Sequence, residues 1–343
     1  MSEPENEPRV FAGIDEAGLG PILGPMTLGY SVWRAPFRAH EAWKKLGRAI
    51  SSEPKRDKDR FIVADSKEVH ARNPRGRKRL EATALGFMAL RRAGQRPPAT
   101  SQDFLLATPA KLRPADSVLA QHPWYRELPD ELPRFQDPLA LELRVAKLAR
   151  ELQKKETEVL DLGVRICPSA ILNESYQETE NKGQTTWLMA AEVIKHLWRE
   201  HAARTTRGLE LVVDRLGGRA HYGALLSKAL PRGTVKVIAE GDTSSSYGVS
   251  ETAPPDSDRP ARRMLITFVE KGERKSIATA LASCLAKYAR ELVMEGFNAY
   301  FESLQPGLKP TAGYRTDGWR WLTDAEAALE RSGLSRDVIV RER

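Results

Sequence analysis

The chain has 343 residues, 41% of them hydrophobic and 29% charged, with a formal net charge of +8. This composition supplies enough apolar side chains for a sizeable core, which excludes a globally disordered protein. No run approaches 18 consecutive apolar residues, so a membrane helix and a membrane partner are not expected. The acidic, polar N-terminus does not resemble a signal peptide. The length predicts two units, or one domain with a large insertion.

The cysteine and histidine content indicates a compartment and excludes some metal sites. Cys167 and Cys284 are too few for a disulfide framework or a cysteine-based zinc ribbon, and they fit a reducing environment. The six histidines are scattered without metal-ligand spacing. We therefore expect a cytoplasmic protein. No protein partner or oligomeric state can be inferred from the sequence.

The positive charge is concentrated in one segment. Residues 54–97 contain 13 Lys or Arg and 5 Asp or Glu, and the densest run is RNPRGRKR at 72–79. One interpretation is an ordinary solvated face. The other is a surface that contacts nucleic-acid phosphates, because clustered cations displace the counterions that condense there. Charge alone does not decide between them.

Hydrophobic periodicity predicts short strands and amphipathic helices in alternation. Residues 1–8 are expected to form a disordered tail, and the polar segment 241–260 is expected to be a loop. The Pro-rich stretch 93–138 and the helix after it are expected to form an insertion, residues 93–155. The catalytic domain would then comprise 9–92 and 156–325, followed by a C-terminal segment, 326–343. Strands are expected at 10–14, 26–33, 61–64, 209–214, 235–239 and 264–269, and helices at 42–50, 80–92, 139–155, 185–202 and 276–304.

This order favours an α/β fold with a mixed central sheet flanked by helices. Four acidic residues lie at the ends of the predicted strands. Asp15 and Glu16 follow the first strand, Asp214 ends another, and Glu273 comes between a strand and the long helix. Adjacent side chains on a strand point to opposite faces, so Asp15 and Glu16 can serve one centre only if the strand ends or bends at them. Such an oxygen-rich set suits Mg²⁺ or Mn²⁺, although a single strand-terminal acid is usually only solvated.

Several motifs together resemble the ribonuclease HII family. Residues 13–21, GIDEAGLGP, with Gly24-Pro25 after them, are similar to the opening motif of that family. Weaker matches follow in the family's order, at 65–67 (DSK), 212–214 (VVD), 271–273 (KGE), 282–287 (ASCLAK) and 313–316 (GYRT). The resemblance spans residues 10–320. It implies a ribonuclease H-like fold with insertions.

The resemblance also implies an activity and a set of site residues. Members are endoribonucleases that hydrolyse the RNA strand of RNA–DNA hybrids, or cut at ribonucleotides embedded in duplex DNA, by two-metal catalysis. The products carry a 3′-hydroxyl and a 5′-phosphate. The catalytic and metal-binding residues would be Asp15, Glu16, Asp214 and Glu273, with two Mg²⁺ or Mn²⁺ ions. The substrate-binding residues would be Gly18, Leu19, Gly20, Ser66, Lys67, Ser283, Lys287 and Tyr314.

The chain departs from the family pattern at a few positions. Leu19 replaces an arginine, Glu273 replaces an aspartate, and Arg215 stands where a glycine usually follows the third acid. Asp242 competes with Glu273 for the fourth ligand position, and we favour Glu273 because it closely precedes the matching helix. Glu291 matches a family acid outside the metal site. Two alternatives therefore stay open: a related metal-dependent nuclease with another nucleic-acid substrate, and an inactive nucleic-acid-binding homologue.

Overall fold

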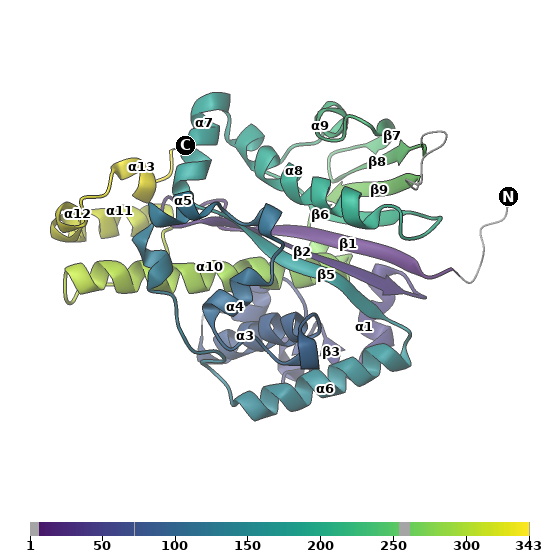
Figure 1. Cartoon of the computed structure of the whole chain (residues 1–343), viewed down its shortest axis with the longest axis horizontal. Coiled ribbons are helices and arrows are strands. Elements are labelled where there is room, and N and C mark those ends of the chain that lie inside the picture. Colours follow the sequence, from purple (N-terminus) through teal and green to yellow (C-terminus); the bar gives the residue numbers. More distant parts are fainter. Residues whose placement is uncertain (1–6, 72, 254–260, 343) are drawn as a thin grey trace.

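The computed structural model describes residues 7–71, 73–253 and 261–342. A seven-stranded mixed sheet runs through it in the order β5-β2-β1-β6-β9-β8-β7 (Figure 1). The strands are β1 (Arg9–Ala17), β2 (Met26–Ala35), β5 (Glu158–Cys167), β6 (Leu209–Asp214), β7 (Thr234–Glu240), β8 (Ser244–Glu251) and β9 (Arg262–Val269). Two short strands, β3 (Ile50–Ser51) and β4 (Phe61–Ile62), form a separate parallel pair.

Parallel pairing in the middle of the sheet brings the predicted acids to one edge. β6 is parallel to β1 and to β9, whereas β2, β5, β7 and β8 pair in antiparallel fashion with their neighbours. Because parallel strands end at the same side of a sheet, the residues that follow β1, β6 and β9 are neighbours in space.

The helices cover both faces of the sheet (Figure 1). The longer ones are α3 (Pro74–Ala89), α6 (Pro138–Lys154), α7 (Ser169–Thr179), α8 (Lys182–His201), α10 (Ile277–Leu304) and α11 (Arg315–Asp324). The shorter ones are α1 (Ala42–Lys45), α2 (Ser66–His70), α4 (Ser101–Leu106), α5 (Asp116–Ala120), α9 (Gly223–Ala229), α12 (Glu326–Ser332) and α13 (Arg336–Ile339). Six 3₁₀ turns complete the set: η1 (Ala39–Glu41), η2 (Pro54–Arg56), η3 (Ala93–Gln95), η4 (Ala110–Leu112), η5 (Pro123–Arg126) and η6 (Gly272–Arg274).

The sheet separates two apolar cores. The larger core lies on the side of α10, α3 and α6, and the smaller lies beneath α8 and α9. α10 lies unusually close to the sheet, because the strands that face it carry glycines. A Cβ on Gly13 would stand 2.0 Å from the backbone nitrogen of Thr279, and one on Gly29 would stand 2.0 Å from the carbonyl oxygen of Ala282. These glycines therefore set the distance between α10 and the strand that carries Asp15.

The predicted α/β class with a mixed central sheet flanked by helices is confirmed. Several details differ from the sequence predictions. β1 continues through both acids to Ala17, and the chain turns only at Gly18, where φ is +84°. The expected helix 42–50 is a single turn followed by β3, and the helix expected at 80–92 begins six residues earlier, at Pro74. The expected loop 241–260 contains β8 in its first part, and its last part, 254–260, lies outside the described residues. Strand β5 and helix α7 were not predicted.

The segment expected to be an insertion packs against α10. Trp124 of η5 is buried with its ring centroid 5.1 Å from that of Phe297. The buried Glu81 carboxylate accepts hydrogen bonds from the backbone N–H groups of Arg134 and Phe135, at 2.9 and 2.8 Å. These contacts fix residues 123–135 over α10 and α3. The boundaries 93–155 and 326–343 remain predictions.

Three expectations concern the chain ends, the cysteines and membranes. The expected tail, residues 1–8, lies outside the described residues except for Glu7 and Pro8, and Glu7 accepts hydrogen bonds from Thr206. Cys167 and Cys284 are both free and buried. Among the helices that the structure describes, none is long and apolar enough to span a membrane.

Candidate active site

Three carboxylates meet where β1 and β6 end. Asp15 and Glu16 lie on β1 and Asp214 is the last residue of β6. One carboxylate oxygen from each lies within 4.8 Å of the others. The Asp15 side chain turns along the strand, since its Oδ1 accepts a hydrogen bond from the Glu16 N–H at 2.8 Å. Two neighbouring acids on a continuous strand therefore reach one centre without the break that the sequence suggested.

The turn after β9 holds the fourth predicted acid. Lys271 adopts a left-handed conformation, φ +56°, and leads into η6, where the Glu273 side chain is buried. The Gly272 N–H donates a hydrogen bond of 2.9 Å to Asp214 Oδ1. Glu273 is close enough to raise the pKa of Glu16 by charge repulsion, although it is not among the three acids that meet within 4.8 Å.

The four carboxylates are buried or half-buried near one another and repel one another when charged. Burial is the main cause that raises the pKa of Asp15 well above its ordinary value, and the charges of Glu16 and Asp214 add to it. Burial and the Asp214 charge raise the pKa of Glu16 to about 7. Burial also raises the pKa values of Asp214 and Glu273. The carboxylates are thus held together at an electrostatic cost that a bound cation would remove.

The donor set fits a hard divalent cation. Glu16 Oε2 is buried and has no hydrogen-bond partner among the residues that the structure describes. An unsatisfied buried carboxylate oxygen is costly unless it is paired or coordinates a metal. Carboxylate oxygens are the ligands that Mg²⁺ and Mn²⁺ prefer. Lys67, an exposed residue of α2, lowers the pKa values of Glu16 and Asp214 by its charge, so the predicted phosphate-binding lysine lies near the same acids.

Two further acids differ from the sequence predictions in their placement. Asp242 is exposed in the turn between β7 and β8, whereas Glu273 is buried. Asp65 was not predicted as a site residue, yet its charge raises the pKa values of Asp214 and Glu273. Its Oδ1 accepts a hydrogen bond from the Lys67 N–H at 2.9 Å and caps α2. The capping role explains its position, and the sequence signal was its place directly after a short apolar strand.

Of the two predicted substrate-binding serines, Ser283 contacts Asp15. The hydroxyl oxygen of Ser283, on α10, lies 3.0 Å from Ser66 Oγ and accepts a hydrogen bond from the Ser66 N–H at 3.3 Å. A hydrogen bond from Ser283 also lowers the pKa of Asp15, against the larger effect of burial. Both hydroxyls are buried. Ser283 therefore orients the Asp15 carboxylate, and Ser66 holds Ser283 in place.

The glycine-rich loop after β1 is fixed from below by a buried arginine. The guanidinium of Arg290 donates hydrogen bonds to the carbonyl oxygens of Pro25, Leu23 and Ala312, at 2.6, 3.3 and 3.0 Å. A Cβ on Gly18 would lie 2.8 Å from Arg290 Cδ. At Gly20 no atom lies within 4 Å of a Cβ position, so the tip of the loop has open space beside it.

The C-terminus also reaches this loop, which the sequence did not indicate. Arg341 donates hydrogen bonds to the carbonyl oxygens of Gly24, at 2.7 Å, and Gly18, at 2.5 Å. Leu19, in the middle of the loop, packs against the apolar core beneath α8. The loop therefore has an apolar anchor at Leu19 and a cationic one at Arg341.

A groove beside the loop contains the remaining predicted residues. Its volume is about 1100 Å³, and Arg77, Lys287 and Tyr314 are among the residues that line it. Tyr314 is 42% exposed, and the preceding Gly313 accepts a hydrogen bond from the Ile22 N–H at 2.8 Å. Lys287 is paired with Glu291, which is thus part of the groove and separate from the acid cluster.

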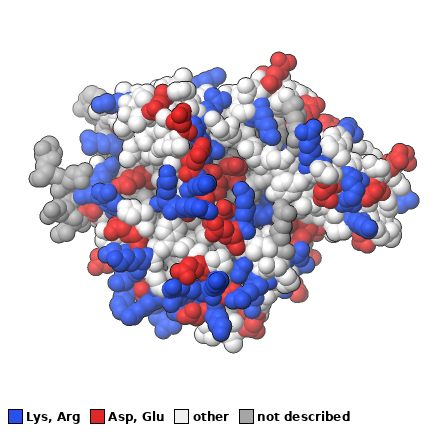
Figure 2. Space-filling view, turned by 180° about the vertical axis from the view of Figure 1, so that it is seen from behind, with Lys and Arg blue, Asp and Glu red and all other residues white. Residues whose placement is uncertain are grey.

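The basic run divides into two groups in the structure. Its described residues lie on the first turns of α3, and Arg72 lies outside the described residues. Arg75 forms a two-contact ion pair with Asp57 at 2.8 and 2.6 Å, and Arg79 lies 3.5 Å from the same carboxylate. Arg77 lines the groove. Seen from behind, Lys and Arg gather on the lower part of the molecule, and acids form a central band above them (Figure 2).

Comparison with known proteins finds likeness only among solved structures. No protein-family model and no curated protein matches the chain. The chain is similar to the PCNA:RNase HII complex from Archaeoglobus fulgidus, with 15% identity, coverage of 97% and 94% of the two chains, and a TM-score of 0.41. It is also similar to ribonuclease H2 from Pyrococcus horikoshii OT3, with 15% identity, coverage of 96% of this chain and 92% of that chain, and a TM-score of 0.42. For RNase H3 from Aquifex aeolicus the identity is 14%, the coverage is 96% of this chain and 70% of that chain, and the TM-score is 0.35.

Proposed function

We propose that the chain is a divalent-metal-dependent endoribonuclease that cuts the RNA strand of RNA–DNA hybrids, or ribonucleotides within duplex DNA. The convergence of Asp15, Glu16 and Asp214 within 4.8 Å, with Glu273 nearby, carries the proposal. Four acids with raised pKa values around an unpartnered carboxylate oxygen suit a pair of Mg²⁺ or Mn²⁺ ions. When bound, such ions lower the pKa of a water and stabilise charge on the attacking and leaving oxygens.

The chain's own residues would position the substrate around this centre. Asp15, held in orientation by Ser283, would hold the ions together with Glu16, Asp214 and Glu273. The backbone of Gly18–Gly20 would approach the ribose, where peptide groups can bind the 2′-hydroxyl that distinguishes RNA from DNA. Tyr314, exposed beside this loop, would pack against the sugar.

Basic residues on the same side would hold the phosphates. Lys67 lies near the acids and Lys287 lines the groove with Tyr314. Phosphate contacts of this kind fix the register of a duplex without reading its sequence. The two steps, cation binding and duplex positioning, therefore rest on separate sets of side chains.

A cleavage assay on four duplexes tests the proposal. All-DNA, all-RNA, RNA–DNA hybrid, and DNA with one ribonucleotide are incubated with Mg²⁺ or Mn²⁺, with a chelator as control. We expect cleavage only of the hybrid or the ribonucleotide-containing duplex, with 3′-hydroxyl and 5′-phosphate ends. Cleavage of all-DNA at an equal rate would indicate a different nuclease, and binding without cleavage would indicate an inactive homologue.

A further inference from the structure

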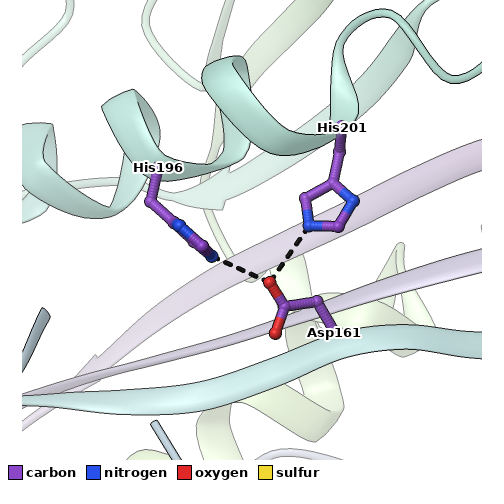
Figure 3. Close-up of side chains that lie close together, drawn as sticks. All are labelled: Asp161, His196 and His201. Atoms are coloured by element: carbon purple, nitrogen blue, oxygen red, sulfur yellow. Dashed lines mark hydrogen bonds and ion pairs between the residues drawn. The ribbon is translucent and has the colours of Figure 1, made fainter. Parts of the chain in front are cut away.

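A second group of metal-ligating side chains lies between β5 and α8. Asp161 projects from β5, and His196 and His201 project from α8 toward it (Figure 3). One ligand atom from each lies within 4.8 Å of the others. The sequence showed no metal-ligand spacing among the histidines. The cluster forms only in the fold, because its third group comes from a strand 35 residues before His196.

The three groups surround one small volume. His196 Nε2 lies 2.8 Å and His201 Nε2 lies 3.0 Å from the same oxygen, Oδ2 of Asp161. A tetrahedral ion with bonds of about 2.0–2.1 Å separates its ligand atoms by about 3.3 Å. Shifts of a few tenths of an ångström would thus open the cluster to an ion. Both histidines are only 2% exposed, so their rings are held in place by packing.

The groups around Asp161 favour its charged form and orient its carboxylate. Burial alone would raise the pKa of Asp161, but the hydrogen bonds from the His196 and His201 rings outweigh it and hold the pKa well below its ordinary value. The Tyr30 hydroxyl donates to the other carboxylate oxygen, Oδ1, at 3.3 Å. Such outer contacts orient ligating carboxylates, and here they leave Oδ2 directed at the two rings.

We propose that Asp161, His196 and His201 bind one Zn²⁺ ion that ties the edge strand β5 to α8. Two imidazoles and a carboxylate are an ordinary zinc ligand set, with water able to take the fourth position. Mg²⁺ would not compete, because it prefers oxygen ligands and retains its waters. This site is chemically distinct from the all-carboxylate cluster, and β2 separates β5 from β1 in the sheet.

The hydrogen bond that Arg204 makes to His201 competes with metal binding. Its Nε donates a hydrogen bond to His201 Nδ1 at 2.9 Å. Nδ1 then offers its lone pair, and the ring proton is assigned to Nε2, facing Asp161. Zinc at Nε2 requires that proton to move to Nδ1, so the Arg204 contact must break. Arg204 is exposed and can turn into solvent. The cluster thus has a proton-bridged and a metal-bridged form, and Arg204 favours the first.

Metal titration of the whole chain tests the site. Zn²⁺ binding is followed by calorimetry and Co²⁺ binding by visible absorption, both in excess Mg²⁺ so that the carboxylate cluster is occupied. We expect one ion per chain, with the intense absorption of tetrahedral Co²⁺. Arg204→Gln should tighten binding by about tenfold, and His196→Gln should weaken it by about a hundredfold or more. Asp15→Asn is the matched control and should leave both affinities unchanged.

Specific results would overturn the proposal. Absence of Zn²⁺ binding in the wild type and in Arg204→Gln would show that the three side chains form a hydrogen-bonded triad only. Loss of binding in Asp15→Asn would assign the ion to the carboxylate cluster. His196 is buried, so His196→Gln could disturb folding. Arg204 is exposed, so Arg204→Gln should fold normally and tests the site independently. An unchanged affinity in Arg204→Gln would refute the competition described for His201.

Discussion

Glu273 and Asp242 differ in how firmly the fold holds them. Glu273 is buried in a tight turn whose neighbouring N–H group binds Asp214, while Asp242 is exposed between two strands. A ligand that is already ordered avoids the entropy cost of ordering when metal binds. The extra methylene of Glu273, relative to an aspartate, lengthens its reach toward the acids.

The Glu273→Gln variant should lose about a hundredfold in the rate of hybrid cleavage, because the amide keeps the size and removes the charge. Asp242→Asn is the matched control and should retain wild-type rates. Glu273→Asp should be tolerated, since it keeps the charge. Initial rates at saturating Mn²⁺ decide the question. Full activity in Glu273→Gln with loss in Asp242→Asn would place the fourth ligand at Asp242.

The sequence pattern singles out the three acids that meet in the structure, but not the groups that support them. Asp15, Glu16 and Asp214 each stand at the end of an apolar run, which is a local signal. Arg290 and Arg341 hold the glycine loop through contacts that join residues more than 250 positions apart. Nothing local distinguishes these arginines from surface ones. The burial of Ser66 and Ser283 could not be predicted either, because they contact each other across 217 positions of the sequence.

At the scale of elements, the two glycines of the loop after β1 have different roles: Gly18 is needed for stability, and Gly20 is proposed to serve ribose recognition. Gly18 has φ +84° and a Cβ there would lie 2.8 Å from the Pro25 carbonyl oxygen. Gly18→Ala should therefore destabilise the protein by roughly 1–3 kcal/mol. Gly20→Ala should change the free energy of unfolding by less than about 0.5 kcal/mol. Denaturant unfolding measures both values.

The same pair of variants tests the role of the loop in ribose recognition. If the backbone at Gly20 approaches the substrate, a methyl group there should weaken binding of a ribonucleotide-containing duplex relative to all-DNA. Binding assays in Ca²⁺ or without metal give the comparison. Equal affinities of wild type and Gly20→Ala for both duplexes would remove the loop from recognition.

Helix α3 presents cations of two kinds, and this refines the prediction for the basic segment. Arg75 is neutralised by Asp57, whereas Arg77 lines the groove with Lys287 and Tyr314. Arg77→Ala should weaken duplex binding and reduce the slope of log affinity against log salt by about 1. Arg75→Ala should leave the slope unchanged. A slope unaffected by Arg77→Ala would make this face an ordinary solvated surface.

Elements with a clear hydrophobic pattern were predicted, and those stabilised by their neighbours were missed. The long helix α10 and the strands β1, β2, β6 and β9 have strong apolar runs. β8 is rich in serine, and its hydrogen bonds to β7 and β9 supply the order that its side chains do not. The apolar run of β5 is interrupted by Asp161 and Arg165, and Asp161 is held by the histidines of α8.

For the whole molecule, the acid cluster makes stability depend on pH and metal. The pKa of Glu16 is raised to about 7 and that of Asp15 is also raised, so these two groups bind more protons in the folded protein than in the unfolded chain. The stability of the metal-free protein should therefore fall as pH rises from about 4.5 to 7. Divalent cations, which bind the charged carboxylates, should restore it most strongly above pH 7.

Thermal unfolding of wild type and Asp15→Asn checks this linkage. In chelator at pH 8, Asp15→Asn should melt about 2 °C or more above the wild type, because one repelling charge is gone. Excess Mn²⁺ should raise the melting temperature of the wild type more than that of the variant. A wild-type melting temperature that changes with neither pH nor Mn²⁺ would show that the carboxylates do not repel one another in the folded protein.

The most direct measurement is the Mn²⁺-dependent cleavage of a DNA duplex with one ribonucleotide and of an RNA–DNA hybrid, by wild type and by Asp15→Asn, alongside duplex binding by each. We expect metal-dependent cleavage of at least one substrate by the wild type. We also expect loss of cleavage in Asp15→Asn with duplex binding retained. Activity of Asp15→Asn within about tenfold of the wild type at saturating metal would contradict the assignment of the acid cluster as the catalytic centre.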